Sequence, residues 1–188
     1  MKVIRPRVAK IVVIAGGAVN LIAIVALVLG ANKGELLNLL EILALIDVSM
    51  WLFFVEPRIE FDHEGVKIVN PIRVFRADWA AVERFETKFG LSVVTKNKSF
   101  VAWSAPAPSR RQVSRLTPQE LKGTALSGLS YIEPGLVQNS ESGSAYLELE
   151  AARSACKSDK VNTFVTMNWL GVAALIAIAV LAAVTLHN

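Results

Sequence analysis

Three long apolar stretches lie along this chain of 188 residues, two near its start and one near its end. Residues 11–30 and 161–186 contain no charged side chain. At about 1.5 Å of rise per residue, each is long enough to cross a hydrocarbon core about 30 Å thick as a helix. The pattern therefore predicts transmembrane helices over 11–30 and 161–186. In the second of these we expect lipid to surround residues 165–186, with Trp169 as an anchor near the interface.

The apolar stretch 36–55 is less regular, because Glu41 and Asp47 interrupt it. A charged residue at the centre of a membrane helix costs about 2.5–3.5 kcal/mol, whereas each Leu, Ile, Phe or Val favours insertion by about 0.3–0.6 kcal/mol. The stretch holds 13 such apolar residues, so the two contributions nearly balance. The link 31–35 is short, and we therefore expect 36–55 to cross the membrane as a hairpin with 11–30.

The polar residues of the predicted hairpin that could carry a function are Asn20, Glu41 and Asp47. Ionisable groups in a membrane are costly and often mark a path for protons or a polar substrate. Asn20 lies near the middle of its span and Asp47 near the middle of its own, so a hairpin brings them to the same depth. We expect a hydrogen bond between Asn20 and a protonated Asp47 to join the two helices. A contact with lipid or a partner helix, and a transport path, are the alternatives.

The stretch after the second span alternates between apolar and polar residues with a period of two, which indicates β-strands. Turn signals at 63–65 and at Asn70-Pro71 separate the first strands. Residues 78–89 are ambiguous, because the apolar residues recur at helical spacing while the charged residues alternate as on a strand. The predicted strands are 58–62, 66–70, 72–77, 91–95 and 100–104.

A linker with a short helix is expected over 111–143, because residues 117–120 have the order of a helix cap, a first-turn proline and a capping box. An amphipathic helix is predicted within 144–160, over residues 144–157. It either packs on the sheet or leads directly into the last span. Cys156 lies on its apolar stripe, and we expect a packed thiol there rather than a nucleophile.

Composition supports the membrane assignment. Hydrophobic residues make up 53% of the chain, charged residues 19%, and the mean hydropathy is +0.46, which is too apolar for an ordinary soluble domain. Four Lys and Arg residues precede the first span, one lies between the first two, and fifteen lie between the second and third. Cytoplasmic loops carry such an excess. We therefore expect a protein of the cell membrane with its basic N-terminus, residues 1–10, and its central module in the cytoplasm, and its C-terminus outside.

Several classes of function are not supported by these residues. The single cysteine, Cys156, and the two histidines, His63 and His187, supply neither an internal disulfide nor a Cys/His metal site. The net charge is +4, but no nucleic-acid motif accompanies it. The module also has no nucleophile motif and no Gly-rich phosphate loop. We expect no catalytic activity, no cofactor and no nucleic-acid partner.

The order of turn and strand residues in the module resembles bacterial membrane proteins that carry a small pleckstrin-homology (PH)-like domain. The matching residues are a Gly before a strand, an Asn-Pro hairpin turn, and a Trp with an apolar residue three positions later: Gly65, Asn70, Pro71, Trp79 and Val82. The resemblance covers residues 57–110. It implies an antiparallel PH-like sheet or partial barrel closed by a C-terminal helix, with Trp79 and Val82 packed inward. The expected fold class is an α+β membrane protein, with a transmembrane helical hairpin before this domain and a third transmembrane helix after it.

Basic residues on and near the domain are its candidate contacts with lipid or with a protein: Lys67, Arg73, Arg76, Arg110 and Arg111. PH domains that bind phosphoinositides carry basic residues on their first strands. Arg73 and Arg76 are three positions apart, however, and so point to opposite faces of a strand. This spacing does not favour a phosphate pocket. A solvated face near anionic headgroups, which attract each charge by about 1 kcal/mol, is the simpler interpretation.

The sequence therefore favours a membrane-anchored interaction module without catalytic activity, which binds a protein or the inner-leaflet surface of the lipid bilayer. The alternative is a small transporter, or a proton-linked subunit of a membrane complex, that uses Asn20, Glu41 and Asp47. Neither hypothesis includes a metal or another cofactor.

Overall fold

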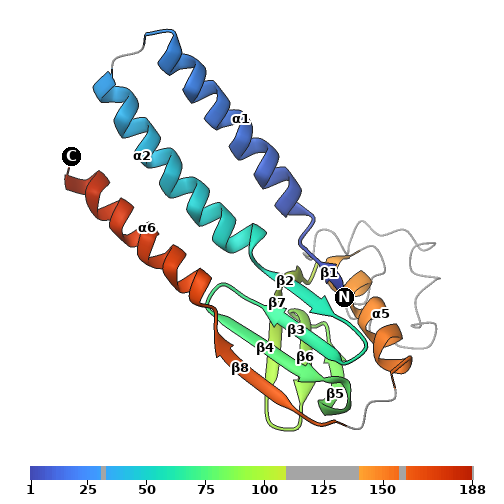
Figure 1. The fold of residues 1–188 in the computed structure, drawn as a ribbon. Coiled ribbons are helices and arrows are strands. Elements are labelled where there is room, and N and C mark those ends of the chain that lie inside the picture. Colours follow the sequence, from blue (N-terminus) through green and yellow to red (C-terminus); the bar gives the residue numbers. More distant parts are fainter. Residues whose placement is uncertain (31–32, 109–139, 157–159, 188) are drawn as a thin grey trace, which may run out of the picture.

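The computed structural model describes residues 1–30, 33–108, 140–156 and 160–187. The short helix predicted in the linker, together with Arg110 and Arg111, lies outside these residues. Within them the chain is an α+β protein with two antiparallel sheets and four α-helices. Figure 1 shows three of the helices, α1, α2 and α6, projecting together from one end of the sheets.

The first two predicted spans are helices. Helix α1 covers Val8–Val28 and α2 covers Lys33–Met50, and the π-helical turn η1 extends α2 over Trp51–Val55. Among the described residues, two segments are long and apolar enough to cross a membrane: Val8–Ala26 and Asn38–Val55. Little of either segment is buried, 17% and 6% respectively. They therefore differ from the core helices of soluble proteins, which are mostly buried.

Five strands form the larger sheet in the order β1-β2-β3-β4-β8, and each neighbouring pair is antiparallel. Its central strands confirm those predicted at 58–62, 66–70 and 72–77. The two edge strands were not predicted, because one lies in the basic N-terminus and the other inside a predicted span. The strands are β1 Lys2–Ile4, β2 Arg58–Phe61, β3 Gly65–Val69, β4 Arg73–Asp78 and β8 Thr163–Met167.

The start of the third predicted span, 161–186, was therefore wrong, and the part expected in lipid, 165–186, begins with residues that belong to β8. Helix α6 covers Trp169–His187, of which Trp169–Ala183 is a shorter apolar helix than the other two. Asn168 separates strand from helix, because its side-chain oxygen accepts a hydrogen bond from the backbone N–H of Gly171 at 3.3 Å and caps the helix. The preceding apolar, partly β-branched residues suit a strand as well as a membrane helix, and pairing with β4 selects the strand.

Three strands form the smaller sheet in the order β5-β6-β7: Val82–Glu86, Gly90–Thr95 and Ser99–Pro106. The last two confirm the strands predicted at 91–95 and 100–104. The ambiguous stretch 78–89 contains both kinds of structure, a turn of 3-10 helix, η2, over Trp79–Ala81 and then β5.

Helix α5 covers Glu141–Ser154 and packs on β6 and β7. It begins earlier than predicted, because the side chain of Ser140 accepts a hydrogen bond from the backbone N–H of Gly143 at 2.9 Å and caps it. It also ends earlier, so the helix expected over 144–160 was wrong at both ends. Of the two alternatives for this helix, packing on the sheet is the one observed. The helix does not lead directly into the last span, because β8 follows α5 along the chain and precedes α6.

The hydrophobic core fills the space between the two sheets and α5. Phe75 of β4 is 2% exposed, and its ring stacks on that of Phe100 with centroids 4.1 Å apart. Leu149 of α5 is fully buried against the same cluster. The sheets and α5 thus share one core, which includes residues of β2 to β7: Ile59, Val66, Ile68, Phe75, Val82, Leu91, Val93 and Ala102.

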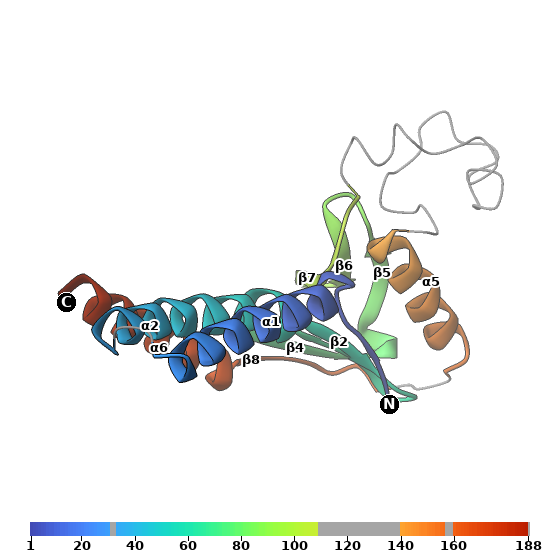
Figure 2. The same ribbon diagram turned by 90° about the horizontal axis from the view of Figure 1, so that it is seen from above.

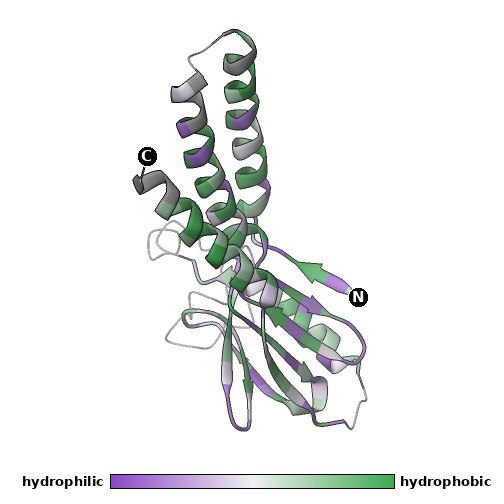
Figure 3. Cartoon of the chain, turned by 60° about the vertical axis from the view of Figure 1, so that its left-hand side comes forward, coloured by the Kyte–Doolittle hydropathy of each residue, from purple (hydrophilic) through white to green (hydrophobic). Residues whose placement is uncertain are grey.

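Each of the three projecting helices continues from a strand of the larger sheet. β1 leads into α1, η1 leads into β2, and β8 leads through Asn168 into α6, as Figures 1 and 2 show. Helix α2 contacts both α1 and α6 and lies between them. Figure 3 shows apolar residues along most of the three helices, with a few hydrophilic positions on α1 and α2. The direction of the larger sheet is therefore tied to the direction of the helices.

Candidate functional site

The edge of the larger sheet formed by β8 is its most exposed part. β8 pairs with β4 on one side only, and each of its five residues is exposed. Three of them are large and apolar: Phe164 is 59% exposed, Val165 42% and Met167 50%. Figure 1 shows β8 at the margin of the sheet, on the side opposite β1. Large apolar side chains on an exposed strand edge are uncommon in natural proteins, because such an edge pairs with other chains.

The hydrogen bonds at the two ends of β8 show which of its backbone groups face β4. Asp78 donates its N–H to the carbonyl of Asn162 at 3.0 Å, and Asn168 donates to the carbonyl of Ile72 at 2.8 Å. Backbone groups alternate in direction along an antiparallel strand. The even-numbered residues of β8 therefore bond to β4, and the N–H and C=O groups of Thr163, Val165 and Met167 point away from the sheet.

The outer face of the larger sheet carries a row of ion pairs across its strands. Glu60, Lys67, Arg76 and Phe164 are consecutive partners in register on β2, β3, β4 and β8. Lys67 pairs with Glu60 at 2.9 Å, and Arg76 pairs with Glu64 at 3.0 Å. The candidate contact residues Lys67 and Arg76 are therefore already bound to carboxylates. Arg73, the third candidate, points to the other face and is exposed at the start of β4.

The same row extends toward the helices through Arg58, which contacts Glu60 at 2.6 Å and Glu56 at 3.0 Å. Burial acts to raise the pKa of Glu60, but the hydrogen bonds and charges of Lys67 and Arg58 outweigh it and lower that pKa below its ordinary value. Burial likewise acts to lower the pKa of Arg58, and the two carboxylates raise it. The groups therefore stabilise each other's charged forms.

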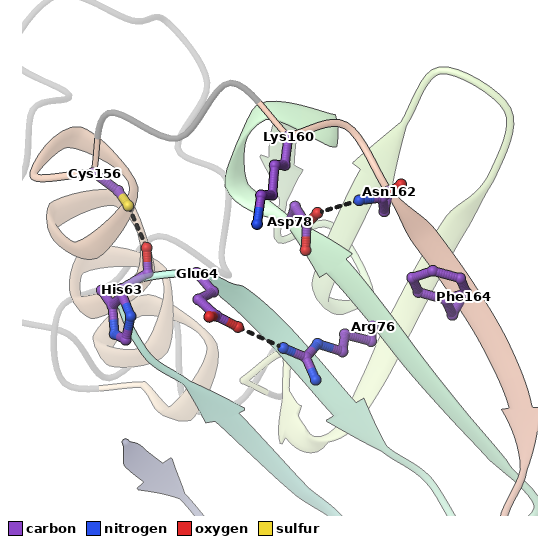
Figure 4. Close-up of a pocket in the computed structure, with 8 residues that line it drawn as sticks. All are labelled: His63, Glu64, Arg76, Asp78, Cys156, Lys160, Asn162 and Phe164. Atoms are coloured by element: carbon purple, nitrogen blue, oxygen red, sulfur yellow. Dashed lines mark hydrogen bonds and ion pairs between the residues drawn. The ribbon is translucent and has the colours of Figure 1, made fainter.

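A polar pocket of about 580 Å³ lies at the end of the larger sheet that is away from α1, α2 and α6. Cys156, just after the end of α5, lies beside it (Figure 4). Arg76 and Glu64 form an ion pair across it, and Asn162 donates to Asp78 at 2.9 Å. The thiol of Cys156 bonds to the backbone carbonyl of His63. The described part of the chain contains no group of three or more His, Cys, Asp or Glu that is placed to hold a metal. Charges of both signs meet here, so the pocket has no strong preference for an anion or a cation.

The five residues of the PH-like pattern have structural positions. A Cβ on Gly65 would overlap the carbonyl oxygen of Ala77 on the neighbouring strand, so only glycine fits there. Trp79 is 3% exposed and donates its indole N–H to the carbonyl of Asp62 at 2.9 Å. Val82 is 2% exposed, and Pro71 is buried beside helix α6.

Asn70 joins the two sheets. Its side chain donates to the carbonyl of Val101 at 2.8 Å and accepts from the N–H of Trp103 at 3.1 Å. Its backbone carbonyl accepts from the side chain of Asn168 at 3.0 Å. The Asn-Pro turn was predicted from sequence as a hairpin turn only, and no local signal indicated that it holds β7 and the start of α6.

The polar residues of the helical hairpin meet as predicted. Asn20 donates to a carboxylate oxygen of Asp47 at 2.6 Å and to the backbone carbonyl of Gly16 at 2.8 Å. A Cβ on Gly16 would lie 3.1 Å from the other oxygen of Asp47, so the absence of a side chain there lets the helices approach closely. Glu41 is partly buried on α2, six residues before Asp47.

An aromatic patch, which the sequence did not predict, lies where the helices meet the smaller sheet. Phe53 of η1 stacks on Trp103 of β7 with ring centroids 6.2 Å apart. These two residues and Phe89 line an apolar pocket of about 590 Å³ near the start of α1. Phe89 lies at the turn before β6 and is 80% exposed. The charge of Lys88 lies 5.3 Å from the centre of the Phe89 ring. Exposed aromatic rings at the ends of helices are typical of a membrane–water interface.

Comparisons of the chain with protein-family models, with curated proteins and with solved structures gave no match. The geometry above is therefore what supports a function.

Proposed function

We propose that this chain is an interaction module of the cell membrane, without catalytic activity, whose PH-like domain presents a binding surface to a protein. The observation that carries the proposal is the continuity of three strands of one sheet with the three apolar helices. Helices that cross the membrane would hold such a sheet at a fixed orientation beside it. The two antiparallel sheets and the packing of α5 on the smaller one support a PH-like fold.

The proposed orientation places the N-terminus and both sheets in the cytoplasm and the end of α6 outside. The excess of Lys and Arg before α1 and between η1 and α6 supports this side. The aromatic patch around Phe53, Phe89 and Trp103 supports a bilayer interface at the level where the helices leave the sheets.

The contacts in the hairpin favour a structural role for its polar residues over transport. Asn20 and Asp47 form a hydrogen bond with each other, so each polar side chain has a hydrogen-bonding partner that lipid hydrocarbon could not supply. A module that binds a protein also needs no reactive group, and the polar pocket at His63 and Cys156 has neither a nucleophile beside a base nor a built anion site.

Fractionation and thiol labelling of the full chain test anchoring and sidedness. We expect the chain to remain in membranes washed with alkaline carbonate. Cys156 is the single cysteine, so a membrane-impermeant maleimide reports on one site. It should label inverted vesicles and not intact cells. The matched control, Asn32→Cys in a Cys156→Ser background, should label from the opposite side, and the reverse pattern would overturn the orientation.

Crosslinking tests the interaction itself. An amine-reactive crosslinker added to inverted vesicles should yield a defined adduct of the full chain with another protein, because the exposed lysines of the sheets lie on the accessible side. A chain that stays monomeric and unmodified by any protein under these conditions would contradict the proposal.

A further inference from the structure

We propose that β8 accepts an extended segment of a partner protein as a sixth strand of the larger sheet, antiparallel to β8. This inference rests on the proposed function, since it identifies the surface through which the module binds. Strand addition to a free edge uses backbone hydrogen bonds for affinity and side-chain contacts for specificity.

The backbone of β8 supplies the bonding groups. Thr163, Val165 and Met167 direct their N–H and C=O groups away from β4, and no other strand of the described residues pairs with them. β8 contains no charged residue and no proline, and its pairing with β4 has no bulge. Among the described residues, it thus lacks the charges, prolines and bulges that natural proteins use to keep an edge from pairing.

The other strand edges of the described residues are protected. β1 has three residues and begins with Lys2. β5 carries Glu83, Arg84 and Glu86, and its register shifts near its start. The edge of β7 is occupied by the side chain of Asn70, which bonds to the carbonyl and N–H groups there. The contrast singles out β8 as the edge suited to binding.

A second copy of the chain does not fit this edge. Two copies in one membrane have the same direction across it, so a twofold axis that relates them runs along the membrane normal. β8 would then run toward the membrane in both copies, and the two strands would be parallel and at equal height. In a parallel pair, a residue whose N–H and C=O point toward the partner strand lies opposite a residue whose groups point away from it. At equal height each residue of β8 would lie opposite its own copy, so this pattern of hydrogen bonds could not form. With the twofold dimer excluded, we take the occupant to be a segment of a different protein.

Side chains beside the edge define the chemistry of that segment. Val165 and Met167 lie on the face toward the smaller sheet, and Met167 pairs in register with Arg73. Arg73 is exposed and forms no ion pair with another described residue. We therefore infer a segment with apolar residues opposite Val165 and Met167 and an acidic side chain within reach of Arg73. Its N-terminal end would face the membrane, because it runs against β8.

Proline substitutions distinguish the loss of a hydrogen-bond donor on the free side of β8 from the loss of a donor on the side that pairs with β4. The N–H of Val165 faces away from β4, so Val165→Pro removes a donor from the free edge without breaking a bond to β4. Val165→Thr keeps the backbone donor and is the matched control. Thr166→Pro removes a donor that bonds to β4 and shows what disruption of the sheet itself looks like.

The probe is a fluorescein-labelled nonapeptide in which valine alternates with threonine and one valine near the N-terminal end is replaced by aspartate, so that the acid lies on the same face as the other valines and as Arg73. Full-length chain in lipid nanodiscs should bind it saturably by fluorescence anisotropy. Val165→Pro should weaken binding at least about tenfold, because a bond is lost and the ring obstructs the edge. Val165→Thr should bind as the unaltered chain does, and Arg73→Gln should bind more weakly with less dependence on salt.

Hydrogen exchange tests the register of the added strand. The peptide should protect the amides of Thr163, Val165 and Met167, which should exchange freely without it. Protection of these amides before the peptide is added would show another occupant, whether lipid, a second copy or the chain itself, and would overturn the proposal. Binding that Val165→Pro leaves unchanged, or no binding to the folded chain, would also overturn it. If Val165→Pro still forms the adduct in inverted vesicles, the proposed function stands and this inference fails.

Discussion

Single residues decide how closely the strands of this protein approach. Gly65 opens β3 directly beside Ala77 of β4, where a side chain would meet the neighbouring carbonyl. Trp79 fills the space below the same turn and bonds to the carbonyl of Asp62. The turn also holds the Asp62 carboxylate, whose pKa is lowered chiefly by the backbone N–H of Glu64 and further by that of Gly65. Gly65, Trp79 and Asp62 therefore stabilise the same turn, through close strand packing, a buried ring and a carboxylate that accepts backbone hydrogen bonds.

Gly65→Ala should lower the free energy of unfolding by about 1–3 kcal/mol, because β3 and β4 must separate to admit the methyl group. Gly17→Ala is the control, since a Cβ at Gly17 would have no neighbour within 4 Å. Urea unfolding in detergent, followed by the intrinsic fluorescence of the four tryptophans, measures both. A loss equal in the two variants would contradict the packing explanation.

Glu60 makes the stability of the sheet depend on pH. Its folded pKa is lowered by Lys67 and Arg58, against the effect of burial, so the carboxylate binds protons more readily when the chain is unfolded. Its contribution is then fully present above the unfolded pKa of about 4.3 and is lost as the pH falls through the folded pKa. Unfolding titrations should show a shallower loss of stability below about pH 4 in Glu60→Gln than in the unaltered chain. Identical slopes would show that the ion pairs do not contribute.

At the scale of elements, polar side chains fasten pieces that are distant in sequence. Asn168 caps α6 and donates to the carbonyl of Asn70 at 3.0 Å and to Glu56 at 3.3 Å. Asn70 in turn bonds to β7. These contacts connect the end of η1, the β3–β4 turn, the smaller sheet and the last helix. The junction between sheets and helices is thus built from amide side chains, of which Asn168 is buried, as well as from apolar packing.

Asn70→Ala should lower the free energy of unfolding by about 0.5–1.5 kcal/mol, because two hydrogen bonds from its side chain to β7 are lost. Asn162→Ala provides a comparison within one sheet, where the loss of a single bond to Asp78 should cost less than about 0.5 kcal/mol. Equal effects would indicate that Asn70 does not hold the two sheets together. Chemical unfolding of both variants in the same detergent measures the difference.

Asp47→Leu should loosen the helical hairpin by about 1 kcal/mol or less, since it removes the bond from Asn20. Asp47→Asn retains an acceptor for that bond and should be close to neutral. Thermal unfolding of the full chain in detergent compares the two variants, and a proton-flux assay in proteoliposomes accompanies it. A normally folded Asp47→Leu chain that loses a measurable proton flux would favour the transport hypothesis instead.

At the scale of the whole molecule, the sheet module and the helices are not separable units. The first and last strands of the larger sheet, β1 and β8, come from the two ends of the chain and each leads into a helix. A module cut from the middle of the sequence would lose both. The strands that adjoin α1 and α6 therefore complete the larger sheet.

A fragment of residues 57–160 should be less stable than one of residues 57–168, because only the longer fragment retains β8 and covers the edge of β4. Urea unfolding and size-exclusion chromatography of both fragments test this. Equal stability would show that β8 contributes little to the sheet and is held in place mainly by its connection to α6.

Local patterns in the sequence were sufficient for the elements that a short stretch of chain specifies. Long apolar runs indicated α1 and α2, and alternation indicated β2, β3, β4, β6 and β7. Equal depth in a hairpin indicated the bond between Asn20 and Asp47. These succeed because helix and strand periods, and the reach of a hairpin, depend on neighbouring residues. Strand alternation also predicted correctly that Arg73 and Arg76 point to opposite faces of β4.

The tertiary structure alone decided what depends on distant partners. Residues 163–167 are apolar enough for a membrane helix, and only the edge of β4 makes them a strand. The acids that bind Lys67 and Arg76 come from β2 and from the β2–β3 turn, and the backbone amide groups that Asn70 reaches lie on another sheet. The exposed edge of β8 has the same origin, because a strand becomes an edge only when the sheet beside it has formed. Composition and period do not encode such long-range pairing, and the candidate binding surface follows from it.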